Sequence, residues 1–188
     1  MMQILRSFRD DDSADVRLAA LFHDCGKALT FSIKERIRFD HHASVSADLV
    51  SKALERLQCP RKRIEKIDWL VRHHMSMTFL EMPEERKAHW YFHPWFPELL
   101  RVMYLDAAGT KPMNDSLYKK IVQDYQQYLD AHPAPPKPLL SGEDVMKLLE
   151  LPPGEEIGRI LKELHDVQVE GKITTKKEAK GWVEKFRK

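Results

Sequence analysis

The stretch LFHDCGKALTF, residues 21–31, closes an apolar segment with a histidine, an aspartate, a glycine and a lysine in close succession. The residues before it, in VRLAALFHD (16–24), are apolar on almost every side of a helix. This pattern predicts a central buried helix, which Gly26 is well placed to end. His23 and Asp24 would then lie at the end of a buried helix. Buried polar groups are costly without a partner, so this pair marks a candidate functional site.

Helical periodicity dominates the remaining chain and predicts an all-α fold. In residues 42–57 the apolar positions Val45, Leu49, Ala53 and Leu57 recur every four residues, with Val50 and Leu54 beside them. Pro60 is well placed to open the next helix, and two further helices are expected within 94–109 and 116–132. The segment RIRF (36–39) is too short for a convincing strand and has no evident pairing partner.

The domain organisation is predicted from a proline-rich segment, AHPAPPKP (131–138), which contains four prolines. Proline removes backbone donors and stiffens an extended chain, so this segment is expected to be a linker. The sequence thus predicts a helical bundle over 1–130 and a small helical module over 139–188. Ser141 and Asp144 predict a helix cap at the start of that module.

Composition sets limits on the location and partners of the protein. The 188 residues carry a formal net charge of +2, although residues 172–188 hold seven Lys/Arg against two acidic residues. The acidic run Asp10–Asp12 is expected to be a solvated turn or helix start. Cys25 and Cys59 are expected to be reduced, and no apolar run approaches the roughly 20 residues of a membrane span. We therefore expect a cytoplasmic protein without a membrane partner.

The placement of the histidines suggests which of them point inward. His42 lies three residues before Val45, and His74 continues a stripe formed by Ile64, Ile67 and Val71. Their neighbours His41 and His73 are rotated by about 100° on a helix. Asp106 follows Val102 by four residues and is expected on a buried face.

A divalent metal ion would satisfy such inward-facing imidazole and carboxylate groups. We predict His23, Asp24 and Asp106 as its ligands. This mixed set fits Mn, Fe, Ni or Zn better than an all-oxygen Mg or Ca cage; Co and Mg stay candidates, and the sequence does not identify the ion. A bound ion acidifies water and polarises a phosphoryl oxygen. Lys27, His42 and His74 are the predicted catalytic residues that would orient or protonate a phosphate.

Several of these segments resemble a known family. FHDCGK (22–27) together with YLDAAG (104–109) is similar to the HD superfamily of metal-dependent phosphohydrolases. With RFDHHASVSADLV (38–50), LVRHHM (70–75) and residues 140–179, the chain resembles the C-terminal HD-domain region of the bacterial tRNA nucleotidyltransferase/poly(A) polymerase family. The resemblance implies an HD-domain helical bundle followed by a small C-terminal helical module. It also supports His23, Asp24 and Asp106 as metal ligands, with His42 and His74 lining the pocket, and it suggests tRNA as a partner.

The sequence departs from the family pattern in three respects. The first metal-binding histidine of the family has no counterpart, since no histidine precedes His23; His42, His74 or water are candidates to complete the site. Ala43 stands where the family usually has glutamate. A glycine-rich turn and a strand with paired carboxylates, which nucleotidyl transfer needs, are not found, so we expect no nucleotide addition by this chain.

The leading prediction is latent metal-dependent hydrolysis of a phosphomonoester or phosphodiester, with a phosphate ester or nucleotide as substrate. A non-catalytic tRNA-binding or scaffold body with a degenerate metal site is the alternative. An independent nucleotide phosphohydrolase is a third reading. The sequence leaves the physiological substrate and the oligomeric state open.

Overall fold

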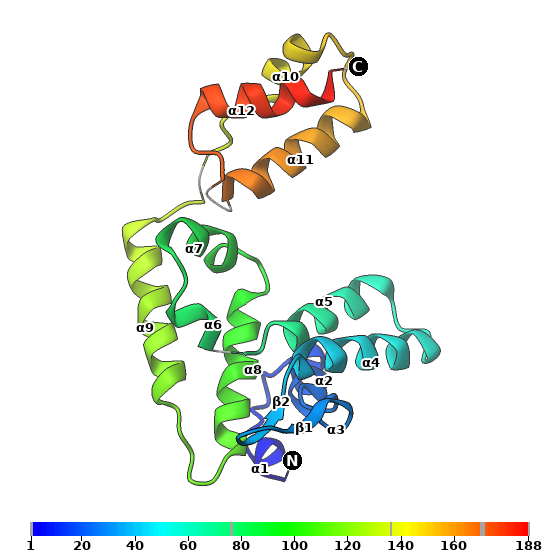
Figure 1. Cartoon of the computed structure of the whole chain (residues 1–188), viewed down its shortest axis with the longest axis vertical. Coiled ribbons are helices and arrows are strands. Elements are labelled where there is room, and N and C mark those ends of the chain that lie inside the picture. The colour runs from blue at the N-terminus through cyan, green and yellow to red at the C-terminus, as the bar shows by residue number, and fades with distance from the viewer. Residues whose placement is uncertain (1, 76, 136, 170–171, 188) are drawn as a thin grey trace. The chain divides into compact units, whose positions relative to one another are not determined.

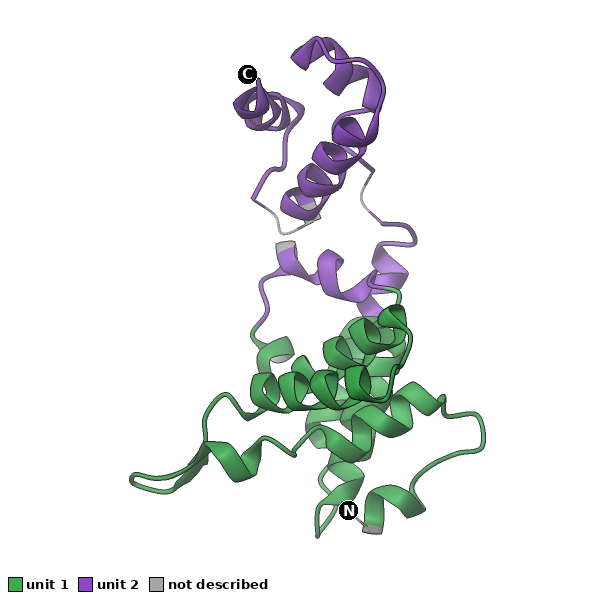
Figure 2. Ribbon diagram, turned by 90° about the vertical axis from the view of Figure 1, so that its right-hand side faces the viewer, with its two compact units in different colours: residues 1–81, 94–125 green, residues 82–93, 126–188 purple. Residues whose placement is uncertain are grey.

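The computed structural model describes residues 2–75, 77–135, 137–169 and 172–187. These residues form two compact units (Figure 2): Met1–Glu81 with Pro94–Tyr125, and Met82–His93 with Gln126–Lys188. We call them unit 1 and unit 2. The domain boundaries that the proline-rich segment suggests, at 130 and 138, stay predictions.

Helices make up almost all regular structure, which confirms the all-α prediction (Figure 1). Unit 1 contains α1 (Met2–Arg6), α2 (Ala14–Phe22), α3 (Lys27–Thr30), α4 (His42–Arg56), α5 (Arg61–Arg72), α6 (Met77–Leu80), α8 (Phe96–Gly109) and the first part of α9 (Ser116–Ala131). Unit 2 contains α7 (Glu84–Tyr91), the end of α9, α10 (Gly142–Leu149), α11 (Glu155–Val169), α12 (Lys176–Val183) and a 3-10 turn (Glu184–Phe186). In unit 1, α2 packs against both α5 and α8.

Gly26 has a different role from the predicted one. Helix α2 already ends at Phe22, and Gly26 lies in right-handed helical conformation at the start of α3, so it is no helix stop. Its amide donates to Ser46 Oγ at 2.8 Å. A Cβ atom here would lie 2.6 Å from the His42 carbonyl oxygen and 2.7 Å from the Ser46 nitrogen. Glycine is therefore needed because the His-Asp turn lies directly against the backbone of α4.

The prediction that no strand exists is also wrong. Strand β1 (Phe31–Ile33) pairs with β2 (Ile37–Phe39) in an antiparallel hairpin with Phe31 opposite Phe39. The pairing partner of RIRF lies directly upstream, across a three-residue turn. The rings of Phe31 and Phe39 lie 5.9 Å apart, a cross-strand aromatic contact that stabilises so short a pair.

The buried face of α4 is shifted by about one residue from the predicted stripe. The predicted stripe residues Leu49 and Leu57 are 37% and 73% exposed, so this part of the prediction is wrong. The buried positions are His42, Ala43, Ser46, Ala47, Val50 and Leu54, which include the two apolar residues predicted beside the stripe. Small residues at 43, 46 and 47 allow close approach to neighbouring segments, a role that hydrophobic periodicity does not register. His42 is nevertheless buried, because it lies four residues before Ser46.

Asp12 is not the solvated residue that the acidic run suggested. Its side chain is 5% exposed and accepts hydrogen bonds from Arg101 Nε at 2.6 Å and Nη2 at 2.8 Å. Arg101 also donates to the Ser7 carbonyl at 2.8 Å. These contacts attach the N-terminal segment to α8, which carries Asp106.

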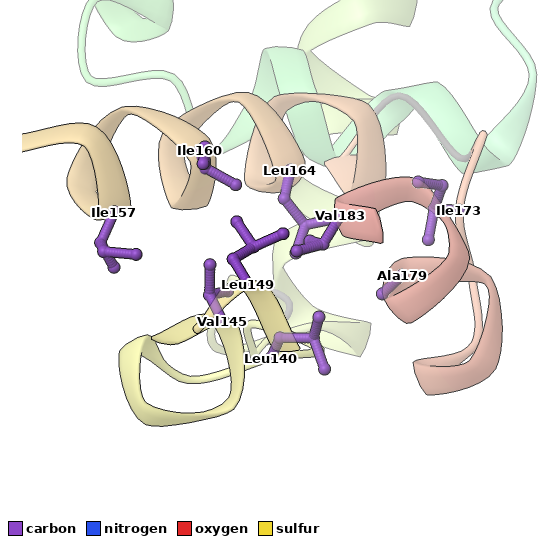
Figure 3. Packing of buried hydrophobic residues seen from close by; sticks show 9 residues of the cluster. All are labelled: Leu140, Val145, Leu149, Ile157, Ile160, Leu164, Ile173, Ala179 and Val183. Carbon is purple, nitrogen blue, oxygen red and sulfur yellow. The ribbon is translucent and has the colours of Figure 1, made fainter. Parts of the chain in front are cut away.

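The C-terminal helices of unit 2 have a core of their own. Leu149, Ile160, Leu164 and Val183 belong to a buried apolar cluster among α10, α11 and α12 (Figure 3). The predicted cap is confirmed: Ser141 Oγ accepts from the Asp144 amide, and the Asp144 carboxylate accepts from the Ser141 amide. Among the described residues, no helix is both long and apolar enough to cross a bilayer.

Replacing Gly26 with alanine should lower the free energy of unfolding of unit 1 by roughly 2 to 3 kcal/mol, because the new methyl group overlaps the α4 backbone. Gly158→Ala is the matched control, since nothing lies within 4 Å of a Cβ atom at this position of α11. It should stabilise its helix by about 1 kcal/mol. Urea denaturation measures both effects. Equal stability of Gly26→Ala and the unmodified chain would contradict the close approach.

Removing the Asp12 charge should make stability less dependent on acid pH. The Arg101 hydrogen bond lowers the pKa of folded Asp12 below 3.8. Its stabilising contribution is therefore complete above the unfolded pKa and is lost as the pH falls through the folded pKa. Asp12→Asn should cost roughly 2 to 4 kcal/mol at pH 7. In urea melts from pH 7 to pH 2 this difference should shrink on acidification; a constant difference would refute the pairing.

Candidate metal centre

The site is centred on His23, which directly follows α2. Its side chain is 5% exposed, and its Nδ1 lies 2.8 Å from the Ala20 carbonyl oxygen. A carbonyl only accepts hydrogen bonds, so Nδ1 carries a proton. The other ring nitrogen, Nε2, lies 3.1 Å from Asp106 Oδ1 on α8 and 3.3 Å from Asp24 Oδ2. One backbone contact thus fixes which edge of the ring faces the carboxylates.

His42 and His74 repeat this arrangement from two other segments. His42 Nδ1 donates to the Phe39 carbonyl at 2.9 Å, and His74 Nδ1 donates to the Val71 carbonyl at 2.7 Å. Their Nε2 atoms lie 3.3 Å and 3.9 Å from Asp24 Oδ1. Each of the three imidazoles is therefore held by a carbonyl three residues upstream and directs Nε2 toward Asp24. Such backbone anchoring of the distal nitrogen is characteristic of metal-binding histidines.

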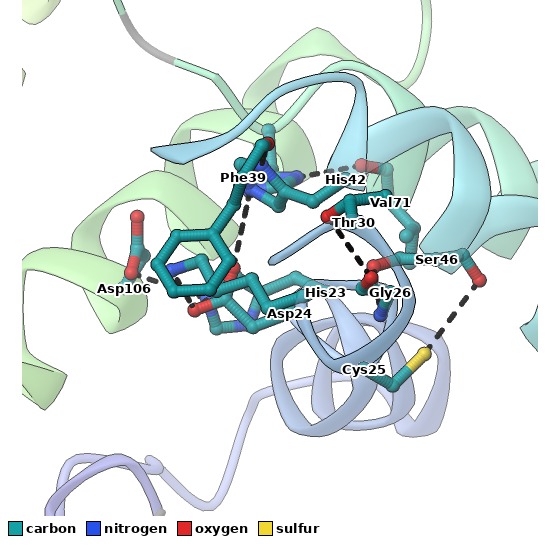
Figure 4. Close-up of polar contacts among 12 residues, drawn as sticks. His23, Asp24, Cys25, Gly26, Thr30, Phe39, His42, Ser46, Val71 and Asp106 are labelled. Atoms are coloured by element: carbon teal, nitrogen blue, oxygen red, sulfur yellow. Dashed lines mark hydrogen bonds and ion pairs between the residues drawn. The ribbon is translucent and has the colours of Figure 1, made fainter. Parts of the chain in front are cut away.

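The carboxylates are the more exposed members of this cluster, in which Asp106 and Asp24 lie beside His23 (Figure 4). The side chains of Asp24 and Asp106 are 35% and 39% exposed, whereas that of His74 is 1% exposed. Lys27 Nζ lies 2.6 Å from Asp24 Oδ2. The imidazole nitrogens thus lie in the interior, whereas the two carboxylates and Lys27 border solvent. A small anionic ligand can therefore approach Lys27 from outside.

Protonation of these groups is strongly coupled to their neighbours. Burial lowers the pKa of His23, but the hydrogen bonds and charges of Asp106 and Asp24 outweigh it and raise this pKa to about 10. Burial raises the pKa of Asp24, but His23 and Lys27 together lower it well below its usual value. Burial also lowers the pKa of His74 to about 4, and the charge of His23 adds to this effect. Burial also raises the pKa of Asp106, but the hydrogen bond and charge of His23 lower it below its usual value. Both carboxylates are therefore ionised and available as anionic ligands.

The donor atoms fit a divalent cation. One ligand atom from each of His23, Asp24 and His74 lies within 4.8 Å of the other two. The structure also brings Asp106 to His23, so the three predicted ligands lie together; their ligand roles stay predictions. His74, predicted as a catalytic residue, lies with them and offers a further imidazole nitrogen.

The remaining predicted residues lie around this cluster. Lys27 and His42 line a hollow of about 480 Å³ beside it, together with Arg36 and His41. His41 is exposed and precedes α4 in left-handed backbone conformation, so its position does not follow from helical phase. His73 contacts Trp69 with ring centroids 5.1 Å apart. Sequence reasoning did not identify Arg36 because the β-hairpin was missed. The signal in the sequence that could have revealed the hairpin was the pair of neighbouring segments FSI (31–33) and RIRF (36–39).

Comparison with known proteins places the site in context. The HD domain family matches residues 1–125. A CC-adding tRNA nucleotidyltransferase of Thermus thermophilus is 39% identical over 176 residues, which cover 90% of this chain and 39% of that protein. An A-adding tRNA nucleotidyltransferase of Deinococcus radiodurans is 32% identical over 186 residues, which cover 95% of this chain and 43% of that protein. The chain thus spans about two fifths of these relatives. No solved structure gives a significant match.

Metal retention tests the donor set directly. Protein loaded with Mn²⁺ or Co²⁺ and then desalted should retain about one ion per chain, measured by elemental mass spectrometry. Asp24→Asn should abolish retention, and His74→Gln should weaken affinity at least about tenfold, because each removes a ligand atom that faces the cluster. His73→Gln is the matched control from the same histidine doublet. Equal metal affinity of the two glutamine variants would contradict this geometry.

Proposed function

Because the chain belongs to the HD domain family, we propose that it is a metal-dependent phosphohydrolase that cleaves a phosphomonoester or phosphodiester. The observation that carries this proposal is the convergence of three backbone-anchored imidazoles on Asp24, with Asp106 and Lys27 alongside. Buried imidazoles beside partly exposed carboxylates suit a cation, and the equally accessible lysine suits an anionic substrate.

We propose His23, Asp24 and Asp106 as the residues that hold the ion, with His74 as a fourth candidate. A bound ion would supply an acidified water and polarise a phosphoryl oxygen. The nitrogen and oxygen donors favour Mn, Fe, Co, Ni or Zn over Mg and Ca. His74 suits ligation better than proton donation, because its proton is on Nδ1, which is bonded to the Val71 carbonyl deep in the protein.

Lys27 and His42 would act on the substrate itself. In hydrolysis a P–O bond forms to the water oxygen, the P–O bond to the leaving oxygen breaks, and a proton from the water ends on the leaving alkoxide. Lys27, whose side chain is 39% exposed, would neutralise the phosphate as a point charge. His42 lines the adjoining hollow and has an inward Nε2, so it would transfer the proton or orient the phosphate.

We further propose tRNA as the macromolecular partner. Two similar proteins are named as tRNA nucleotidyltransferases, and residues 172–188 are rich in lysine. We do not assign the nucleotide addition of those proteins to this chain, because the chain spans only about two fifths of their length. The expectation that this chain adds no nucleotide stays a prediction. Among the residues that the structure describes, no specific contact favours a purely non-catalytic body over the phosphohydrolase.

The activity is tested with p-nitrophenyl phosphate, bis-p-nitrophenyl phosphate and 2′,3′-cyclic AMP in the presence of Mn²⁺, Ni²⁺ or Co²⁺. At least one ester should be hydrolysed, and EDTA should stop the reaction. Asp24→Asn should lower kcat/KM by about 1,000-fold or more, since it removes a charge shared by the ion and Lys27. Asp48→Asn, at an exposed position of α4, is the control. Absence of turnover in metal-loaded protein would overturn the proposal.

tRNA binding is tested by gel shift at several salt concentrations. Affinity should fall steeply between about 50 and 200 mM salt, because phosphate contacts release counterions. Replacing Lys176, Lys177 and Lys180 with glutamine should weaken tRNA binding relative to the unmodified chain at the same salt concentration. Affinity that does not change with salt would contradict an electrostatic tRNA interface.

A further inference from the structure

The hollow beside the metal centre has properties that the hydrolytic site does not use. It shares Lys27 and His42 with the centre, and its other polar lining includes Arg36, Arg38 and His41. These residues come from the β-hairpin and from the turn that leads into α4. A substrate whose scissile phosphate lies at the centre would therefore extend into a basic hollow.

Asp40 is the acidic residue of this lining, and its charge is already compensated. Its carboxylate lies 3.2 Å from Arg38 Nε and 3.6 Å from Lys34 Nζ. Lys27 is likewise engaged with Asp24. Within the described ranges, the side chains of Arg36 and His41 make no hydrogen bond or ion pair. The hollow thus presents two uncommitted donors and a surplus of positive charge.

The backbone at His41 gives an independent argument. His41 has φ 63°, in the left-handed region where glycine is favoured over residues with a Cβ atom. It precedes α4, yet its side chain makes no capping hydrogen bond. It is exposed, so it adds nothing to the core. Neither capping nor packing accounts for an imidazole at this position, whereas a ligand in the hollow would.

We propose that this hollow is a second anion subsite, in which Arg36 and His41 bind a second phosphate group of the same substrate. A guanidinium matches two phosphate oxygens at once, and an imidazole N–H donates to a third. The preferred substrates are then nucleotides with two separate phosphates or 3′-phosphorylated RNA ends. Placing the scissile phosphate at the metal centre rests on the proposed function. Binding of the second phosphate by Arg36 and His41 does not depend on it.

The first experiment measures binding without metal. Titration calorimetry in EDTA follows adenosine 3′,5′-bisphosphate binding to the full chain. Arg36→Gln and His41→Gly should each weaken binding about tenfold. Two variants serve as matched controls. For Arg36→Gln it is Arg56→Gln, which removes a like charge about 20 Å along α4 from His42. For His41→Gly it is Gln58→Gly, which replaces another residue with positive φ, 54°. Both controls should bind as the unmodified chain does. Glycine fits the backbone at 41, so His41→Gly should keep its melting temperature.

The second experiment measures turnover with Mn²⁺. The kcat/KM for adenosine 3′,5′-bisphosphate should exceed that for adenosine 3′-monophosphate about tenfold, and both variants should reduce this ratio. The dinucleotide ApAp, with a 3′-terminal phosphate, identifies the source: a larger kcat/KM than the bisphosphate indicates an RNA end, and a smaller one indicates a free nucleotide.

The two experiments separate the subsite from the proposed hydrolysis. If no substrate turns over, the proposed function fails, and the metal-free titration alone decides the subsite. Unchanged bisphosphate affinity in both Arg36→Gln and His41→Gly would overturn it. A turnover ratio near one in the unmodified chain would overturn its assignment to a second phosphate.

Discussion

The candidate site depends on how closely the His-Asp turn approaches the first turn of α4. Gly26 has no side chain, and its amide binds Ser46 Oγ at 2.8 Å. This contact brings Asp24, two residues earlier, to 3.3 Å from His42 Nε2. Without that approach the carboxylate would lose its contact with His42. The glycine therefore positions two functional side chains without touching a ligand itself.

The second constraint is the repeated Nδ1 hydrogen bond to a carbonyl three residues upstream. It occurs at the end of α2 for His23, at the first residue of α4 for His42 and just after α5 for His74. In each case the backbone fixes the ring orientation before any ligand arrives. A preorganised donor set binds a cation without first having to order these side chains, because each Nε2 already faces the same carboxylate.

Much of this site was predictable because its residues carry chemistry that a core does not need. His23, Asp24 and Asp106 lie together as their inward phases suggested, although α2 ends earlier than predicted. His74 was assigned to a helical stripe, yet α5 ends at Arg72 and a turn buries His74 instead. The hairpin and the close packing of Gly26 were not predictable in this way, because both depend on contacts between segments rather than on periodicity within one.

The measurement that tests the central claim most directly is anomalous X-ray diffraction from crystals of the Co²⁺-loaded protein. The geometry predicts one strong peak bonded to Nε2 of His23 and to carboxylate oxygens of Asp24 and Asp106, with every Nδ1 still bonded to its carbonyl. A peak at Nδ1, or an ion bound away from Asp24, would contradict the account.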